Sequence, residues 1–200
     1  MKDILASPLR ALVAGLALSA AMLGIAIGYG GTDVRGLVSF LVRWVHIAGA
    51  IVWLGMIWFV NFIQLVAVAE SDQPARGAIM KHIVPRVAAT FRQASHWTIA
   101  SGAVLLVTSG YLGGSLMFGA PVFVPTIRNA LLWAGTFGAM AMYMFVHMMI
   151  WPGLRIVLGM EPGDADKIAA ARVRVATYAR WNLVLAVPVT VAMVAAAHLY

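Results

Sequence analysis

Long stretches without a charged residue are the feature of this sequence that most constrains its fold. Each of five such stretches has the length, about 20 residues, that a helix needs to cross a bilayer. Charged residues make up 10% of the chain and apolar residues 62%, against about 25% and 45–50% in a soluble domain. The sequence therefore predicts an all-α integral membrane protein. The charge-free stretches are 11–32, 44–69, 93–127, 129–154 and 181–200.

The third of these stretches is too long for a single helix. Gly113, Gly114, Pro121 and Pro125 interrupt its second half, and because such residues mark turns and loops, we expect an external loop there. The first stretch exceeds the apolar core of a signal peptide, about 7–15 residues, and is expected to remain a helix. We therefore predict five transmembrane helices in one membrane domain, residues 1–200. The expected spans are roughly 11–30, 40–66, 88–112, 128–151 and 177–200.

Lysine and arginine are distributed unevenly between the segments that join the spans. Segments 1–10, 70–92 and 155–180 carry 11 of the 14, whereas 33–43 and 115–128 carry 3. Because cytoplasmic loops hold the excess of these residues, the pattern predicts a cytoplasmic N-terminus and a periplasmic C-terminus in a bacterial inner membrane. The net charge of +7 then indicates contact with membrane lipid rather than nucleic acid.

The absence of cysteine narrows the possible chemistry. With no Cys in the chain, disulfides, iron–sulfur clusters and covalently attached c-type haem are excluded. Any haem must then be held by His or Met. The sequence also lacks a P-loop, a dinucleotide-binding fingerprint and an H-E-x-x-H motif, and it gives no candidate catalytic residue.

Four of the five histidines lie inside the expected spans, one in each of the second to fifth helices. At 1.5 Å per residue, His46 lies about 9 Å below the outer membrane face, and His198 lies near the same face. His96 and His147 lie near the inner face. Each pair joins two helices, which is the arrangement that two axial imidazoles of a haem b need. We therefore predict a four-helix haem-binding bundle with two bis-histidine haems, one for each pair.

Residues beside the histidines fit the same interpretation. Arg43 lies three residues before His46, and the second helix places both on one face. Arg92 lies four residues before His96, so each arginine can reach a haem propionate. Gly49 would leave room for the porphyrin edge. The alternative is a hydrogen-bonded packing role for each histidine and snorkelling to the membrane surface for each arginine.

Two further groups of side chains allow a functional and a structural interpretation. Met140, Met144 and Met148 share one face of the fourth helix. Methionine with histidine suits Cu(I), but gap filling by a flexible side chain is favoured. Asn61 and Gln64 lie one turn apart deep in the second helix. They could bind a quinone, although hydrogen bonding between helices is favoured.

Four segments of the chain resemble a known family. Residues 44–64 read WVHIAGAIVWLGMIWFVNFIQ, residues 95–112 begin with Ser-His-Trp, residues 145–149 read FVHMM, and residues 180–200 run through Asn and Pro to a closing His. In this order they resemble the membrane domain of bacterial membrane-bound urate oxidase, and more distantly the copper-resistance D and HemJ-type haem-b membrane proteins. The matching residues are His46, Gly49, Trp53, Gly55, Asn61, Phe62, Gln64, His96, Trp97, Ser109, Gly110, His147, Asn182, Pro188 and His198.

The resemblance implies haem b and an external electron partner, a cytochrome c or a redox enzyme subunit. Together with the histidine pairs, it leads to the hypothesis of a haem-b membrane subunit that transfers electrons between that partner and quinone or another membrane complex. Two alternatives stay open. One is a membrane-bound oxidase similar to urate oxidase or protoporphyrinogen oxidase, and the other is a copper-handling or accessory structural subunit.

Overall fold

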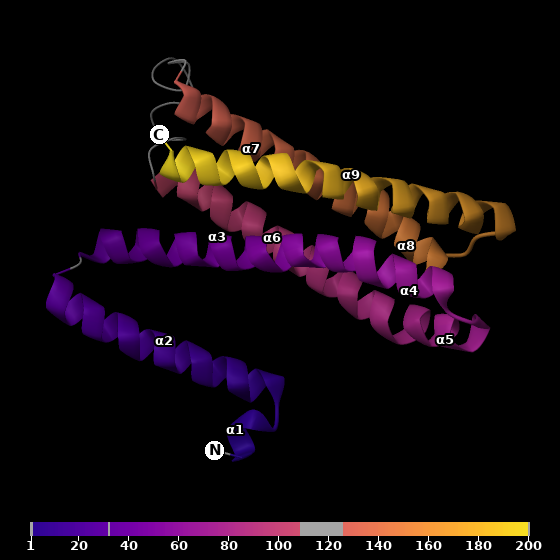
Figure 1. Ribbon diagram of the computed structural model, residues 1–200, viewed down its shortest axis with the longest axis horizontal. Helices are drawn as coiled ribbons and strands as arrows, with labels where there is room; N and C mark the ends of the chain where they lie inside the picture. Colours follow the sequence, from indigo (N-terminus) through magenta and orange to yellow (C-terminus); the bar gives the residue numbers. More distant parts are fainter. Residues whose placement is uncertain (1, 32, 109–125, 200) are drawn as a thin grey trace. The chain divides into compact units, whose positions relative to one another are not determined.

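The computed structural model describes residues 2–31, 33–108 and 126–199. Of these residues 92% are helical, and no strand occurs among them, which confirms the all-α prediction (Figure 1). The chain divides into two compact units, Met1–Leu41 and Val42–Tyr200.

Four helical stretches of the described chain are long and apolar enough to cross a membrane. They contain the first, second and fourth expected spans and most of the fifth. The third expected span corresponds to α6 (Val84–Thr108), which is 25 residues long but is not among the four. Arg86, Arg92 and several uncharged polar residues make its first half less apolar. The expected external loop lies outside the described residues. The four stretches are Pro8–Gly30, Val34–Glu70, Ile127–Val157 and Ala165–His198.

The first unit holds α1 (Lys2–Leu5), α2 (Pro8–Gly30) and the start of α3 (Val34–Phe59). Pro8 suits the first position of α2 because its fixed φ is already helical and its missing N–H has no partner to lose there. Gly31 ends the helix with φ 63°, a left-handed conformation that glycine adopts without steric cost. No residue of α2 is buried, so its apolar side chains suit a lipid environment.

The second unit consists of helical stretches that run in alternating directions, as Figure 1 shows. The stretch that begins as α3 is followed by an oppositely directed one that ends as α6, and the next two alternate in the same way. Among the described residues of this unit, three π-helical segments lie within these stretches, a feature that is frequent at functional sites. The remaining elements are η1 (Val60–Gln64), α4 (Leu65–Glu70), α5 (Gln73–Ala78), η2 (Ile79–Ile83), α7 (Ile127–Met144), η4 (Phe145–Ile150), α8 (Trp151–Val157) and α9 (Ala165–His198).

Polar side chains fix the turns at one end of this unit. Asp164 accepts a hydrogen bond from the Lys167 backbone N–H at 2.8 Å and caps α9. Asp72 caps α5 in the same way. The Arg76 guanidinium donates to the backbone carbonyls of three residues at the end of α4 and in the turn that follows. Pro188 lies inside α9, which continues as one helix through it.

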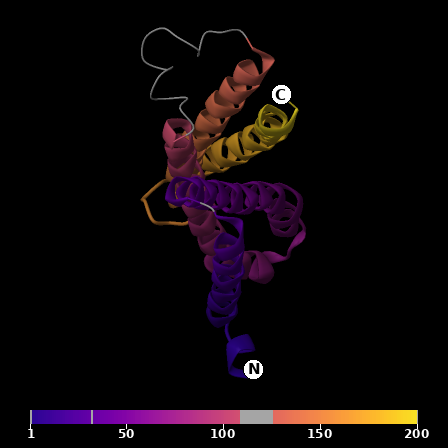
Figure 2. The same ribbon diagram turned by 90° about the vertical axis from the view of Figure 1, so that its left-hand side faces the viewer.

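Helices α7 and α9 form the closest helix pair of this unit. They lie side by side in Figures 1 and 2. A Cβ atom on Gly138 of α7 would lie 2.5 Å from the Val189 side chain of α9, and one on Gly135 would lie 3.0 Å from Met193. The glycines therefore allow the close approach, as small residues do between membrane helices.

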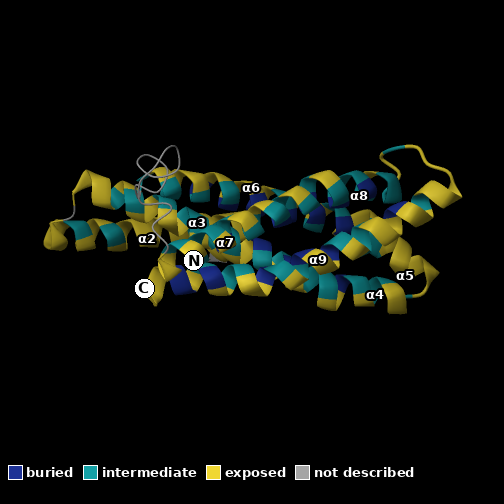
Figure 3. Cartoon of the chain, turned by 90° about the horizontal axis from the view of Figure 1, so that it is seen from above, coloured by how far each residue is buried: buried dark blue, intermediate teal, exposed yellow. Residues whose placement is uncertain are grey.

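The core of the second unit is apolar and is contributed by four of its helical stretches. Figure 3 shows buried residues recurring along α6 and α9, with exposed residues between them. Trp53, one of the residues that carry the family resemblance, is 3% exposed and belongs to this core. The core cluster contains Trp53, Ile57, Phe91, Ala94, Met142, Val146 and Ala186.

Candidate functional site

Two of the four candidate histidines come into direct contact. The rings of His96 on α6 and His147 on η4 have centroids 4.4 Å apart and planes tilted by 36°. Tyr143, one helical turn before His147, packs on both: its ring centroid is 4.2 Å from that of His147 and 5.5 Å from that of His96. With Ser95, these residues form what we call the histidine cluster. The predicted inner pair is therefore brought together.

Hydrogen bonds hold the two imidazoles of the cluster in place. The hydroxyl of Ser95, which is fully buried, donates to the Arg92 carbonyl at 2.8 Å. Its Oγ is then free to accept from His147 Nε2, which lies 3.1 Å away. On the other side, the Tyr143 hydroxyl lies 2.9 Å from His96 Nδ1. No described residue bonds His96 Nε2, which is the atom that remains for a metal.

Arg92 places a positive charge beside the cluster. Its guanidinium carbon lies 4.1 Å from the ring centroid of Trp151, a cation–π contact. Its Nε is buried, and none of the described residues accepts a hydrogen bond from it. Since a buried donor without an acceptor is costly, this atom fits an anionic partner such as a haem propionate.

His46 packs against α6, in a different setting from its predicted partner. Because a carbonyl oxygen can only accept, His46 Nδ1–H donates to the Thr98 carbonyl at 2.9 Å. A Cβ atom on Gly102 would lie 2.9 Å from His46 Cε1, so the imidazole lies flush with the α6 backbone. Because Nδ1 carries the hydrogen, Nε2 keeps its lone pair. In metal-binding histidines, the ring nitrogen that does not bind the metal commonly donates a hydrogen bond in this way.

His46 contacts α6 nearer to His96 than its assignment to the outer pair led us to expect. His46 contacts α6 at Thr98 and Gly102, two and six residues beyond His96. At 1.5 Å per residue these contacts lie roughly 3–9 Å from His96 along the helix. The physical reason is that α3 begins at Val34 rather than near residue 40, which puts His46 deeper in its helix.

The other residues of the predicted outer site lie apart. His198 is the last residue of α9 and is exposed, and no hydrogen bond or ring contact joins it to His46 in the part of the chain that is described. Arg43 is exposed. A Cβ atom on Gly49 would lie 2.8 Å from Thr98 Oγ1, so α6 fills the space where we expected a porphyrin edge.

The donor set of the histidine cluster fits a haem better than a multi-ligand metal site. No group of three or more His, Asp or Glu side chains that could hold a metal ion occurs among residues 2–31, 33–108 and 126–199. With metal–nitrogen bonds of about 2 Å, two axial imidazoles have ring centroids roughly 6 Å apart. The rings of His96 and His147 must therefore separate from 4.4 Å, which the exposure of His96 allows.

The methionine stripe takes no part in this cluster. Met140, Met144 and Met148 are exposed, whereas Met142 is 1% exposed and belongs to the core. Gap filling thus describes Met142 but not the stripe, whose members lie on the outer surface of the second unit.

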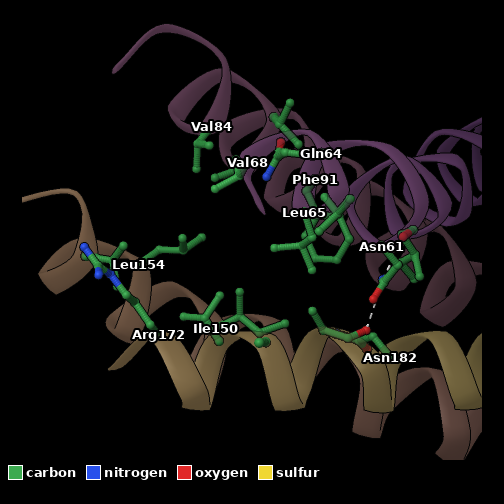
Figure 4. Close-up of a pocket in the computed structure, with 18 of the residues that line it drawn as sticks. Asn61, Gln64, Leu65, Val68, Val84, Phe91, Ile150, Leu154, Arg172 and Asn182 are labelled. Carbon is green, nitrogen blue, oxygen red and sulfur yellow. Dashed lines mark hydrogen bonds between the residues drawn. The ribbon is translucent and has the colours of Figure 1, made fainter. Parts of the chain in front are cut away.

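A second candidate site is a cavity of about 310 Å³ whose lining is mainly apolar. Asn61 and Gln64, the polar pair noted in the sequence, line it from η1, and Asn182 lines it from α9. Figure 4 shows Asn61 and Asn182 near one end and Arg172 at the other. Asn61 donates to the Ile57 and Ala179 carbonyls, so the predicted hydrogen bonding between helices is present for this residue.

Sequence reasoning gave no role to Ser95 or Tyr143 and used Asn182 only as a motif match. Helical spacing was a usable signal for Tyr143, which precedes His147 by four residues and shares its face. Asn182 is the only amide side chain in the charge-free stretch 181–200. Polar residues in such surroundings usually face the bundle interior.

Comparisons with family models, curated proteins and solved structures find no match to this chain.

Proposed function

We propose that this chain is a haem-b-binding membrane subunit that transfers electrons. It would act between an external redox partner, a cytochrome c or an enzyme subunit, and quinone or another membrane complex. One haem would be held at the histidine cluster by His96 and His147. The observation that carries the proposal is the contact of these two imidazoles from separate helices, with ring centroids 4.4 Å apart.

Haem b, when bound, supplies one-electron chemistry in an apolar setting. The chain's own residues hold and orient the ligands. Tyr143 accepts from His96 Nδ1–H when Nε2 is the ligand, which fixes the ring tautomer. His147 Nε2, which lies 3.1 Å from Ser95 Oγ, would be the ligand atom from the other helix. Arg92, whose Nε has no acceptor among the described residues, is suited to a propionate.

The hypothesis also includes a second haem, which would be held by His46 and His198. The support for this site comes from one of its two histidines. It is supported on the His46 side by the Nδ1–H bond to the Thr98 carbonyl, which orients the ring and frees Nε2. The His198 side lacks such support, since this residue is exposed at the end of α9. Coordination there requires the end of α9 to approach α3.

The proposed location is a bacterial inner membrane, with α6 as a fifth span. Support comes from the alternating helix directions, because the turns at 71–72 and 158–164 then lie at one end of the second unit (Figure 1). Arg76, Lys81, Arg155 and Lys167 lie in or beside these turns. A cytoplasmic position for this end satisfies the positive-inside rule.

An optical spectrum tests the proposal directly. Purified chain reduced with dithionite should show the absorption bands of a six-coordinate haem b, with a haem-to-protein ratio of at least one. His147→Ala and His96→Ala should each abolish the low-spin signal of this haem. His82→Ala is the matched control, because His82 is exposed in η2 and distant in sequence from the cluster. Haem bands that survive both cluster variants unchanged would exclude the assignment.

Copper handling is the second candidate, and one observation favours it. The contact of the two imidazoles, with ring centroids 4.4 Å apart, would bring them near enough to ligate a single small ion. Cu(I) accepts imidazole and thioether ligands. Metal analysis of the purified chain that finds copper, with no Soret band, would support this candidate over haem.

The oxidase alternative rests on the resemblance to the membrane domain of urate oxidase. It predicts that urate or protoporphyrinogen reduces the bound haem. Absence of reduction by both substrates, with normal reduction by dithionite, would leave electron transfer as the better description.

A further inference from the structure

The cavity of the second unit combines apolar walls with polar atoms that have no partner. Its volume is about 310 Å³, at the lower end of the range of roughly 300–1,000 Å³ for small-molecule sites. Segments η1, α6 and α9 contribute most of the residues that line the cavity (Figure 4). Phe91, Leu65 and Val84 are among its apolar lining residues.

Three side-chain atoms in this cavity are buried and unsatisfied. They are Oε1 of Gln64 and both amide atoms of Asn182, none of which has a hydrogen-bond partner among the described residues. Gln64 is 8% exposed and Asn182 is 0% exposed. Because buried polar groups are nearly always hydrogen-bonded, these amides indicate a molecule that supplies both donors and acceptors.

The lining also restricts the charge of that molecule. Arg172 is the only charged residue among the described residues that line the cavity. It precedes Asn182 by ten residues on α9, which corresponds to about 15 Å of helix. A charged group at the amide end would be buried without a counter-charge, which is strongly unfavourable. The ligand is therefore neutral where it meets the amides.

We infer that this cavity is a binding site for a quinone or quinol. The carbonyl or hydroxyl groups of the ring would pair with Asn182 and Gln64, Phe91 would contact the ring, and the apolar tail would lie along the remaining wall. A molecule of this class is neutral and lipid-soluble. The quinone carbonyls can accept from Asn182 Nδ2, and the hydroxyls of the quinol can also donate to Asn182 Oδ1 and Gln64 Oε1. The binding is independent of haem, but a role for this quinone as electron partner rests on the proposed function.

Calorimetric titration of the purified full chain in detergent tests the inference. The probes are decylubiquinone and menadione, each as quinone and as quinol. Wild type should bind one equivalent of at least one probe. Asn182→Leu and Gln64→Leu should weaken binding at least tenfold, and Ala176→Phe, which fills the cavity, should abolish it. Gln93→Leu makes the same amide-to-leucine change at an exposed position of α6 and should bind like wild type.

Folding of the variants is checked by thermal unfolding without ligand. Asn182→Leu removes two unsatisfied polar atoms, so its unfolding temperature should equal or exceed that of wild type while its quinone affinity falls. This combination distinguishes a ligand site from a structural amide.

Three results would overturn the inference. One is no saturable binding of either probe, which would mean that water alone satisfies the amides. Another is equal affinity in Asn182→Leu and Gln93→Leu. The third is loss of binding in Arg172→Leu but not in Asn182→Leu, which would indicate an anionic lipid. A normal haem spectrum with no quinone binding would refute this inference alone, and quinone binding without haem would refute only the proposed function.

Discussion

The imidazoles of His96 and His147 lie 4.4 Å apart, centroid to centroid, although the two residues are 51 positions apart in the sequence. Tyr143 touches both rings and lies within hydrogen-bond distance of His96 Nδ1. The histidine cluster is therefore held by contacts between two helices rather than by either helix alone. Its behaviour should depend on Tyr143 as well as on the histidines.

Replacement of Tyr143 by phenylalanine tests this dependence. The change keeps the ring contact with His147 and removes the oxygen 2.9 Å from His96 Nδ1. Loss of a partner to the second nitrogen of a ligating histidine weakens metal binding about 10- to 100-fold. Haem titration of Tyr143→Phe should show this loss, together with a higher midpoint potential because His96 becomes a weaker donor.

Tyr178→Phe is the control for that experiment, since Tyr178 packs on Phe145 at 5.1 Å and is not a member of the cluster. Its haem affinity and midpoint potential should match those of wild type. Equal potentials in Tyr143→Phe and wild type would mean that the Tyr143 hydroxyl does not act on a haem ligand.

The contact between Gly49 and Thr98 makes a prediction about stability. A methyl group on Gly49 would meet Thr98 Oγ1 at 2.8 Å and the Thr98 backbone nitrogen at 3.2 Å, and a backbone atom cannot move aside easily. Gly49→Ala should therefore lower the free energy of unfolding by about 1–3 kcal/mol, the usual cost of overpacking. Thermal or denaturant unfolding in detergent measures the change.

Gly55 provides the comparison on the same helix. No atom lies within 4 Å of a Cβ placed there, so Gly55→Ala should leave stability unchanged or raise it by up to about 1 kcal/mol through better helix propensity. If the two alanine variants have the same stability, α3 and α6 do not pack as closely as described.

The seam between α7 and α9 can be tested by a double-mutant cycle. Gly138→Ala alone should destabilise the chain, because its Cβ would lie 2.5 Å from the Val189 side chain. Val189→Ala creates the missing space, so the same glycine change should cost less in that background. The coupling free energy should be about 0.5–3 kcal/mol, as for residues in contact. A coupling of zero would contradict the register of the two helices.

Much of the helical layout follows from the sequence because charge marks the ends of apolar helices. Charged residues lie near an end of each of the four long apolar stretches, and Asp164 caps the beginning of the last one. The beginning of α3 was misjudged because Arg35 and Arg43 lie within the helix. Arginine stems are apolar and tolerate such positions, so a charged residue was a poor marker of the helix end.

The details of the sites were harder to predict, for a different reason. Pairing His96 with His147 needed only their depth, which spacing provides. The Thr98 carbonyl that bonds His46 and the unpartnered amide of Asn182 depend on how the helices are rotated about their axes. In a helix that is apolar on nearly all sides, periodicity does not fix that rotation. The π-helical segments change it further at Asn61 and Gln64.

The proposed orientation of the second unit is testable because the native chain has no cysteine, so every introduced thiol reports one position. Gln73→Cys and Asp166→Cys lie at exposed positions at the basic end of the unit, and Ile127→Cys and Leu199→Cys lie at exposed positions at the other end. A membrane-impermeant maleimide added to intact cells with a permeabilised outer membrane should label only the second pair. After disruption of the inner membrane, all four should be labelled. Labelling of Gln73→Cys and Asp166→Cys in intact cells would reverse the orientation, and labelling of one residue from each pair would contradict the alternating arrangement of the helices.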